Sequence, residues 1–437
     1  MAPHFADEIP SHLLMWQRVR EYAVPPSMIE TATARRAAGD WAGACAAARV
    51  DVALDPRAVR VRHGTDLFHR VRTDLRRLAP DLLRWHMPRI APDGRLRPGL
   101  TVSLARYERS GAGPLHLVVR TPPAWADGGQ RISLDLWEGA AHEGAAALHP
   151  HPHPDRRFRL DLHRHLWDAG RGGELARRAA AGLAAEAEVL LRAEGRSARG
   201  AFAVRLAARE HAVFELVAPD DGHAPTLRSL PGPPVTGLPL LPEAATRPLP
   251  DVELLRAGLV PAERLHPLVA AALAPSGEVR AAVPGPEPGD PHRVECRGEI
   301  HRIALRDEVL TAIDHDPAQL RREELLVALG GPGLPCLRAI DAAHRSPEAL
   351  PAVRERLLHG DVAGALTVVE GLLGRAALLR DGPLRDALTT AATRHVDAGL
   401  FRAGLTSWDA TRRRSRPWDA PPNKQPGRGH PRSALAC

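Results

Sequence analysis

Lysine is almost absent from this 437-residue chain: the only one is Lys424, close to the C-terminus, whereas arginine is abundant. A P-loop needs a lysine on the phosphates, a protein kinase needs a strand lysine, and pyridoxal-phosphate enzymes need a lysine for the Schiff base. The residues before Lys424 can carry none of these chemistries in their usual form. The excess of arginine, alanine, proline and glycine is typical of a GC-rich genome and needs no functional explanation.

Cysteines and long apolar segments are also scarce. The four cysteines, Cys45, Cys296, Cys336 and Cys437, form no C-x-x-C pair, so we expect reduced thiols rather than a disulfide framework. No run of about 18 apolar residues is present, which argues against a membrane span, and the N-terminus lacks the pattern of a signal peptide. We therefore expect a cytoplasmic protein with no membrane partner.

The net charge of +7 is concentrated at the C-terminus. Six arginines, one lysine and one aspartate in residues 411–437 give +6, which leaves +1 for residues 1–410. A nucleic-acid-binding domain usually carries its basic excess on the folded part. Arginines beside an aromatic side chain instead suit nucleic acid or an acidic protein surface at the tail itself. The candidate partner-binding residues there are Arg412, Arg413, Arg414, Arg416 and Trp418. A solvated C-terminus without a partner is the alternative that we favour.

Apolar periodicity predicts an α+β fold. Four segments alternate with period two and predict half-buried antiparallel strands, 98–107, 114–121, 131–139 and 157–165. The predicted organisation is a helical region with a helix–turn–helix hairpin (1–92), an antiparallel sheet with a long covering helix (93–217), a Pro/Gly-rich connection (218–290), a small β-meander followed by helices (291–404) and a disordered basic tail (405–437). The long helix is expected over residues 174–195.

One short motif occurs twice. The sequence G-D-x-A-G-A at residues 39–44 returns at residues 360–365, each time between two apolar helical segments. A glycine suits the left-handed C-terminal cap of the first helix, and the aspartate suits the N-cap of the second. The turn resembles the helical hairpin of tetratricopeptide-type repeats over about twelve residues, without the full repeat pattern or a tandem array. A generic capped helix–helix turn is the alternative that we favour.

Histidines are concentrated between residues 149 and 165. In the predicted fourth strand, Asp161, His163 and His165 share the face opposite to the apolar side chains. A D-x-H-x-H pattern on one strand face can bring two imidazoles and a carboxylate to a divalent metal. The preceding H-P-H-P-H-P run favours polyproline II, in which alternate residues do not point the same way. A polar strand edge without metal is the interpretation that we favour over a metal site.

Other catalytic patterns are missing or incomplete. His142-Glu143 begins like H-E-x-x-H, but Ala146 stands where the second histidine is needed, and no G-x-S-x-G occurs. Cys296 with nearby histidines could form a thiol–imidazole pair, although a β-hairpin explains the segment better. Trp137 follows the predicted apolar face with the opposite phase, so it is a candidate anchor for a partner. Packing under a loop is the alternative that we favour.

These observations identify no catalytic residue and no cofactor beyond the metal hypothesis. We therefore expect a non-enzymatic interaction or scaffold protein that binds a protein partner through its helical hairpins. Two alternatives stay open. One is a metal-dependent enzyme or metal-responsive binder at the histidine-rich strand, and the other is a nucleic-acid-associated protein that acts through its arginine-rich tail.

Overall fold

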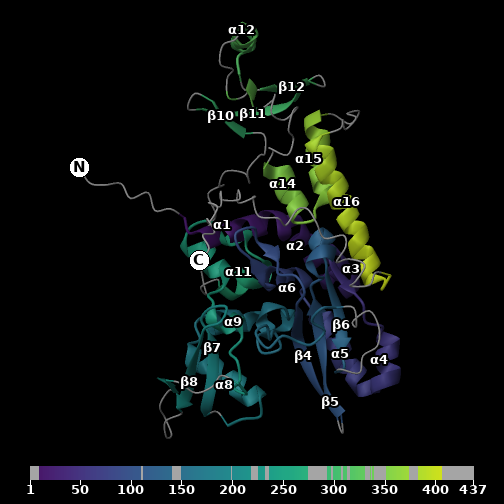
Figure 1. The fold of residues 1–437 in the computed structure, drawn as a ribbon, viewed down its shortest axis with the longest axis vertical. Coiled ribbons are helices and arrows are strands. Elements are labelled where there is room, and N and C mark those ends of the chain that lie inside the picture. The colour runs from purple at the N-terminus through teal and green to yellow at the C-terminus, as the bar shows by residue number, and fades with distance from the viewer. Residues whose placement is uncertain are drawn as a thin grey trace, which may run out of the picture.

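The computed structural model describes residues 9–405 of the chain, apart from several internal gaps. The gaps are residues 110–111, 140–148, 198, 218–224, 232–235, 274–292, 297–298, 307–308, 313–314, 330–334, 336, 339–350 and 374–381. The described part is an α+β protein (Figure 1). This confirms the fold class expected from the periodicity.

The N-terminal region is mainly helical, but it also contains a strand that the periodicity did not predict, β1 (Val50–Val52). Its elements are α1 (Ser11–Arg18), the π-helical η1 (Val19–Ala23), α2 (Pro26–Ala37), α3 (Trp41–Ala47), α4 (Pro56–His63), α5 (Thr65–Arg77) and α6 (Pro80–His86). The apolar side chains Leu67, Val71 and Leu75 of α5 are spaced by four residues and are all buried. This spacing places them on one helical face, which packs into the main core.

The main sheet has the strand order β1-β6-β5-β4. Its strands are β1 (Val50–Val52), β4 (Thr101–Arg109), β5 (Ala112–Arg120) and β6 (Ile132–Trp137); β1 is parallel to β6, and the other pairs are antiparallel. Ile132, Leu134 and Leu136 are buried in the core that the N-terminal helices share, which confirms the predicted phase. A short hairpin, β2 (Arg89–Ile90) with β3 (Arg95–Leu96), precedes β4 in the chain.

The predicted fourth strand is wrong. Residues 157–165 form turns, one parallel bridge from Arg159 to Ser103 and the 3-10 helix η5 (Arg164–Leu166). The N–H groups of Asp155 and Asp161 do bond to the edge of β4. Between these two points the chain turns back on itself, so no continuous ladder forms. Alternation alone cannot distinguish this pattern from a strand.

The predicted single helix over residues 174–195 is divided. The structure has η6 (Ala169–Glu174), α7 (Leu175–Ala179) and α8 (Leu183–Ala193), with Gly182 before α8. Helix α8 packs with its own small core on a three-stranded antiparallel sheet. That sheet contains β7 (Gly200–Arg205), β8 (His211–Val217) and β9 (Thr226–Ser229).

Part of the Pro/Gly-rich stretch also packs into the main core. Described elements there are α9 (Glu243–Thr246), α10 (Pro250–Arg256), η7 (Ala262–Arg264) and α11 (Pro267–Leu273). Leu254 and Val269 are fully buried in the cluster that the N-terminal helices build. These short helices therefore cover the N-terminal core rather than only bridging two regions.

The C-terminal part contains a meander and further helices. The elements are β10 (Arg293–Cys296), β11 (Glu299–Arg306), β12 (Val309–Ala312), α12 (Pro317–Ala328), α14 (Pro351–Leu358), α15 (Val362–Leu373) and α16 (Pro383–Arg402). Helix α16 runs back along the body and contacts two short 3-10 helices, η2 (Ala124–Ala126) and η3 (Gly128–Gln130) (Figure 1). Among the described residues, no helix has the length and apolar character needed to cross a membrane.

Candidate protein-binding site

The repeated motif forms the same turn in both places. Gly39 ends the first hairpin helix at φ +78°, and Gly360 does so at φ +77°. In each copy the glycine N–H and the following aspartate N–H bond back to carbonyls of the preceding helix. This is the Schellman arrangement that glycine favours, because a Cβ is disfavoured at this backbone conformation. The predicted hairpins α2–α3 and α14–α15 are thereby confirmed.

The aspartate of each copy caps the second helix. Asp40 Oδ1 accepts from the Gly43 N–H at 2.8 Å, and Asp361 Oδ1 accepts from the Gly364 N–H at 3.2 Å. A Cβ on either of these glycines would overlap the carboxylate, which explains the second glycine of the motif. The resulting turn presents a carboxylate beside helix C-terminal carbonyls, and both carry negative potential.

An arginine of the first helix completes the turn in both copies. Arg35 Nη1 donates to Asp40 Oδ2 at 3.1 Å, and Arg356 Nη1 donates to Asp361 Oδ2 at 2.7 Å. Each arginine lies five residues before its aspartate. The structural match between the two hairpins therefore extends beyond the six-residue motif. The two hairpins are matched in backbone, cap and ion pair.

The C-terminal copy is docked on the body of the protein. Arg49, two residues after the end of α3, donates through Nη1 to the His359 carbonyl at 2.9 Å, and its Nη2 lies 3.3 Å from Asp361 Oδ1. The Tyr22 ring stacks on the His359 ring with centroids 6.4 Å apart. Gly360 lies so close to Gly129 that a Cβ would overlap the Gly129 backbone. The turn therefore contacts the Arg49 guanidinium, the Tyr22 ring and the Gly129 backbone.

The N-terminal copy presents the same turn to solvent. The Asp40 side chain is 40% exposed and that of Arg35 is 59% exposed, against 18% and 33% for Asp361 and Arg356. A Cβ on Gly39 would meet nothing within 4 Å. The Gly43 N–H, with the Arg35 guanidinium, holds the pKa of Asp40 below its usual value, so this carboxylate is ionised at neutral pH.

The docked turn buries an imidazole among arginines. His359 is fully buried, and neither of its ring nitrogens has a hydrogen-bond partner among the described residues. Burial, reinforced by the positive charges of Arg89, Arg84, Arg95 and Arg49, lowers the pKa of His359 to about 3. The histidine is therefore neutral in the folded protein under ordinary conditions. The matched position in the free hairpin is Ala38, which is exposed.

Acid is expected to destabilise the docked hairpin through His359. In the unfolded chain an imidazole is protonated near pH 6.5, whereas the folded state resists protonation down to about pH 3. The unfolded state therefore binds more protons between these values, and stability falls as the pH drops below about 6.5, by about 1.4 kcal/mol at pH 5.5 for one such group. Between pH 7 and 5.5, the free energy of unfolding of His359→Gln, measured with urea, should fall less than that of the unmodified protein by this amount. The exposed His153→Gln serves as the control, and an unchanged loss in His359→Gln would contradict this account.

The predicted metal residues lie close in sequence but have separate partners. Asp161 pairs with Arg159 at 2.8 Å, and His163 Nε2 lies 2.9 Å from Glu186 Oε2. His165 is buried, and burial lowers its pKa to about 2. Within the described residues, no group of three or more His, Cys, Asp or Glu side chains is arranged to hold a metal. Metal binding at Asp161, His163 and His165 stays a prediction that this geometry does not support.

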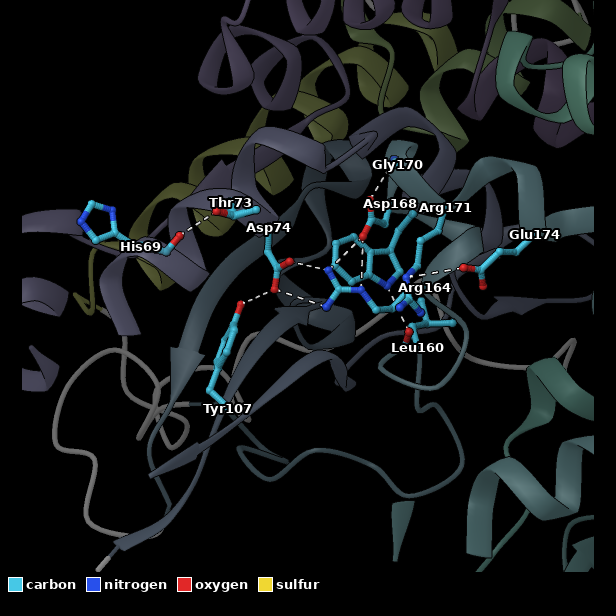
Figure 2. A network of polar contacts seen from close by, with 11 residues as sticks. His69, Thr73, Asp74, Tyr107, Leu160, Arg164, Asp168, Gly170, Arg171 and Glu174 are labelled. Atoms are coloured by element: carbon cyan, nitrogen blue, oxygen red, sulfur yellow. Dashed lines mark hydrogen bonds and ion pairs between the residues drawn. The ribbon is translucent and has the colours of Figure 1, made fainter. Parts of the chain in front are cut away.

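A buried ion network fixes this segment instead (Figure 2). Arg164, between the two histidines, bonds to Asp74 of α5 and to Asp168, with Nη2 2.9 Å from Asp168 Oδ2. The Tyr107 hydroxyl of β4 donates to Asp74 Oδ2 at 2.7 Å. The guanidinium also lies over the Trp167 ring, 4.6 Å from its centroid. The network joins a helix, a strand and the η5 segment, so its role is structural.

Trp137 lies on the polar face of the main sheet, as its phase predicted. It is half-buried rather than exposed, between His116 at 5.4 Å and His153 at 5.8 Å between ring centroids. Ser103 Oγ lies 2.9 Å from His116 Nδ1 on the same face. Contact between Trp137 and a partner stays a prediction.

The remaining candidates lie outside the described residues. These are Arg412, Arg413, Arg414, Arg416 and Trp418 of the basic tail. Binding of nucleic acid or of an acidic surface by this tail also stays a prediction. Of the thiol–imidazole candidate, the structure describes β10 paired with β11, with Val294 opposite His301 and Cys296 opposite Glu299, which agrees with a hairpin.

The sequence did not indicate which residues contact the docked hairpin. Arg49 belongs to no motif, and Gly129 lies between the predicted strands 114–121 and 131–139. One signal was available: the position before the motif is Ala38 in one copy and His359 in the other. A large ring at one copy and a methyl group at the other indicates that the two turns have different surroundings.

Comparison with protein-family models, with curated proteins and with solved structures gives no match for this chain.

Proposed function

We propose that this chain is a non-enzymatic interaction protein that binds another protein through the exposed turn of its α2–α3 hairpin. The observation that supports the proposal is the docked copy of the same turn. Within this one molecule, a hairpin with matching caps and ion pair is bound by Arg49, Tyr22 and Gly129. The second copy offers the same acceptor groups to solvent.

The docked copy also indicates the chemistry of the partner. Arg49 uses two N–H groups on a helix C-terminal carbonyl and the N-cap carboxylate, and charge-assisted contacts of this kind are stronger than neutral hydrogen bonds. The glycine backbone of η3 permits close approach. The partner is therefore expected to present an arginine next to an exposed backbone segment that lacks large side chains.

Small cavities are consistent with binding rather than catalysis. The two best-formed pockets among the described residues have volumes of about 30 and 20 Å³. Pockets that hold small-molecule ligands usually have volumes of about 300–1,000 Å³. A contact between protein surfaces does not require such a pocket.

The proposal predicts that changes at the turn remove a partner. The full-length protein is recovered from its own cells under gentle conditions with nuclease, and co-purifying proteins are quantified by mass spectrometry. Ala38→Glu adds bulk and charge at the turn, and Asp40→Asn removes the carboxylate charge while keeping an N-cap residue. Both should lower recovery of one stoichiometric partner by at least about tenfold, since two charge-assisted contacts are worth roughly 1.5–3 kcal/mol each.

Val61→Glu provides the matched control, because Val61 is 84% exposed on α4, away from the turn. It adds the same charge and should retain the partner. Urea unfolding should show that all three variants keep the stability of the parent within about 1 kcal/mol. Equal recovery of every co-purifying protein by Ala38→Glu and Val61→Glu would overturn the proposal.

A further inference from the structure

Helix α5 presents a group of arginines to solvent. Its apolar residues Leu67, Val71 and Leu75 are buried in the main core, so the opposite face of the helix is open. From residue 69 to the end of the helix at residue 77, the exposed residues are His69, Thr73 and four arginines, Arg70, Arg72, Arg76 and Arg77. These four arginines form the basic face of α5 and lie within about two helical turns, or about 10 Å of helix.

The basic face has no acidic side chain to balance it. Asp74 is the only carboxylate in residues 67–77. It is buried and bonds to Arg164 and to the Tyr107 hydroxyl on the inner side of the helix (Figure 2). Within the part of the chain that the structure describes, none of the four exposed arginines has an ion pair. Their charges are therefore open to an anionic partner.

Interactions within the helix do not account for these charges. Arg72 and Arg76 are four residues apart, and like charges at this spacing disfavour a helix. The helix dipole favours cations in the last turn, which accounts for Arg76 and Arg77 but not for Arg70 and Arg72. Arg70 also lies 5.2 Å from the Tyr107 ring centroid, and this contact leaves the residue exposed.

Helix α4 adds charge beside the basic face. The two helices are joined at Gly64 and pack on each other. Arg57 and Arg60 are exposed on α4 and have no ion pair among the described residues, whereas Arg62 pairs with Glu138 at 2.9 Å. Residues 56–77 contain seven arginines and two aspartates, a net charge of +5, whereas residues 1–410 together carry +1. A genome-wide preference for arginine does not by itself remove carboxylates from this one surface.

We propose that the basic face of α5, extended by Arg57 and Arg60, binds the phosphate backbone of a nucleic-acid duplex without reading its sequence. Guanidinium groups suit phosphate oxygens because two parallel N–H groups can bind one phosphate. A duplex carries one negative charge per about 1.7 Å of its axis, so about 10 Å of duplex presents about six phosphates. This contact is independent of the proposed protein partner of the α2–α3 turn.

Other anionic partners fit this surface less well. Single strands are usually held by bases that stack on aromatic rings, but α5 has no Tyr or Trp, and Phe68 is half-buried against the core. A helix that binds a membrane surface inserts an exposed apolar face, whereas the apolar face of α5 is buried. Charge density and the lack of exposed rings therefore favour the duplex backbone.

The test uses full-length protein and a fluorescein-labelled DNA duplex of about 20 base pairs, with binding followed by fluorescence anisotropy from about 50 to 200 mM NaCl. Each neutralised phosphate contributes about −0.9 to the slope of log Kobs against log[NaCl]. Four contacts should give a slope of about −3.6 and about a hundredfold loss of affinity over this range. An RNA duplex of the same length should compete with the DNA, whereas poly-glutamate or phosphatidylserine vesicles of equal total charge should not.

Arg72→Glu is the main variant. It places a carboxylate four residues before Arg76, a spacing that supports the helix while it neutralises the second arginine. The slope should become less steep by about 2, and the affinity at about 50 mM NaCl should fall at least about tenfold. Arg321→Glu makes the same change at an exposed position of α12 and should bind like the parent. Urea unfolding should give the same midpoint for both variants and the parent.

A second variant, Arg70→Gln with Arg77→Gln, removes two charges from the other side of the basic face and should also lower the slope by about 2. The contribution of the tail is separated by a full-length variant with glutamine in place of Arg412, Arg413, Arg414 and Arg416, which should keep the slope within about 1 of the parent. Equal duplex binding by Arg72→Glu and Arg321→Glu would overturn the proposal. The same holds for binding that is lost only with the tail arginines, for equal competition by poly-glutamate or vesicles, and for no duplex binding at about 50 mM NaCl.

Discussion

Gly360→Ala is expected to lower the free energy of unfolding by about 2–5 kcal/mol, whereas Gly39→Ala costs only about 1–2 kcal/mol. The two glycines have nearly the same positive φ, so the backbone cost of about 1–2 kcal/mol is shared. Only Gly360 is packed against the backbone of Gly129, so a methyl group there adds overpacking of about 1–3 kcal/mol. The difference between the two variants measures docking of the α14–α15 hairpin.

Urea unfolding gives the two free energies, and amide hydrogen exchange locates the change. In Gly360→Ala, protection should fall in α14–α16 and in η3, while the N-terminal core keeps its protection. Equal losses in the two glycine variants would contradict the docked geometry, and with it the model for the partner of the free turn.

Asp251→Ala is expected to cost about 3–5 kcal/mol. Asp251 is fully buried and accepts from Arg20 Nη2 at 2.9 Å and from Trp85 Nε1 at 2.7 Å. Arg20 is 3% exposed and lies 3.8 Å from the Trp85 ring centroid. Removing the carboxylate leaves a buried guanidinium without its counter-ion and an indole N–H without an acceptor, which is the costly way to break a buried pair.

The same measurement on Glu188→Ala provides the contrast. Glu188 pairs with Arg192 on the surface of α8, where both side chains are at least 30% exposed, so the expected loss is below about 1 kcal/mol. The double variant Arg20→Met, Asp251→Leu should be more stable than Asp251→Ala, because it removes both charges together. If Asp251→Ala lowers the free energy of unfolding as little as Glu188→Ala does, the buried Asp251–Arg20 pair does not hold α10 on the N-terminal core.

Local sequence patterns were sufficient to predict several helices, strands and hairpins. The spacing of Leu67, Val71 and Leu75 predicted a helix with one buried face, and Ile132, Leu134 and Leu136 predicted the inner face of β6. The two G-D-x-A-G-A motifs predicted two capped hairpins. Each of these depends on interactions within a few residues, namely backbone conformation, capping and periodicity, so the sequence specifies them without knowledge of the rest of the fold.

The alternation of apolar and polar residues gave a wrong strand prediction where tertiary contacts compete with the hydrogen bonds of a β-sheet. Residues 157–165 alternate like a strand, but the chain turns between Arg159 and Arg164. Arg159 pairs with Glu194 at the end of α8, and Arg164 pairs with Asp74 of α5. The shared strand face of Asp161, His163 and His165 does not exist, because a turn does not keep the period of two. Side-chain direction in such a segment depends on partners far away in the sequence.

Residue patterns alone specify the α+β composition and the two matched hairpins. Long-range packing places one hairpin turn against Arg49 and Gly129 and leaves the other exposed. It also buries Asp251 of α10 against Arg20 and Trp85. The physical reason is range: caps and periodicity act over about one helical turn, whereas docking and burial of charge depend on residues that are hundreds of positions apart, such as Arg49 and His359.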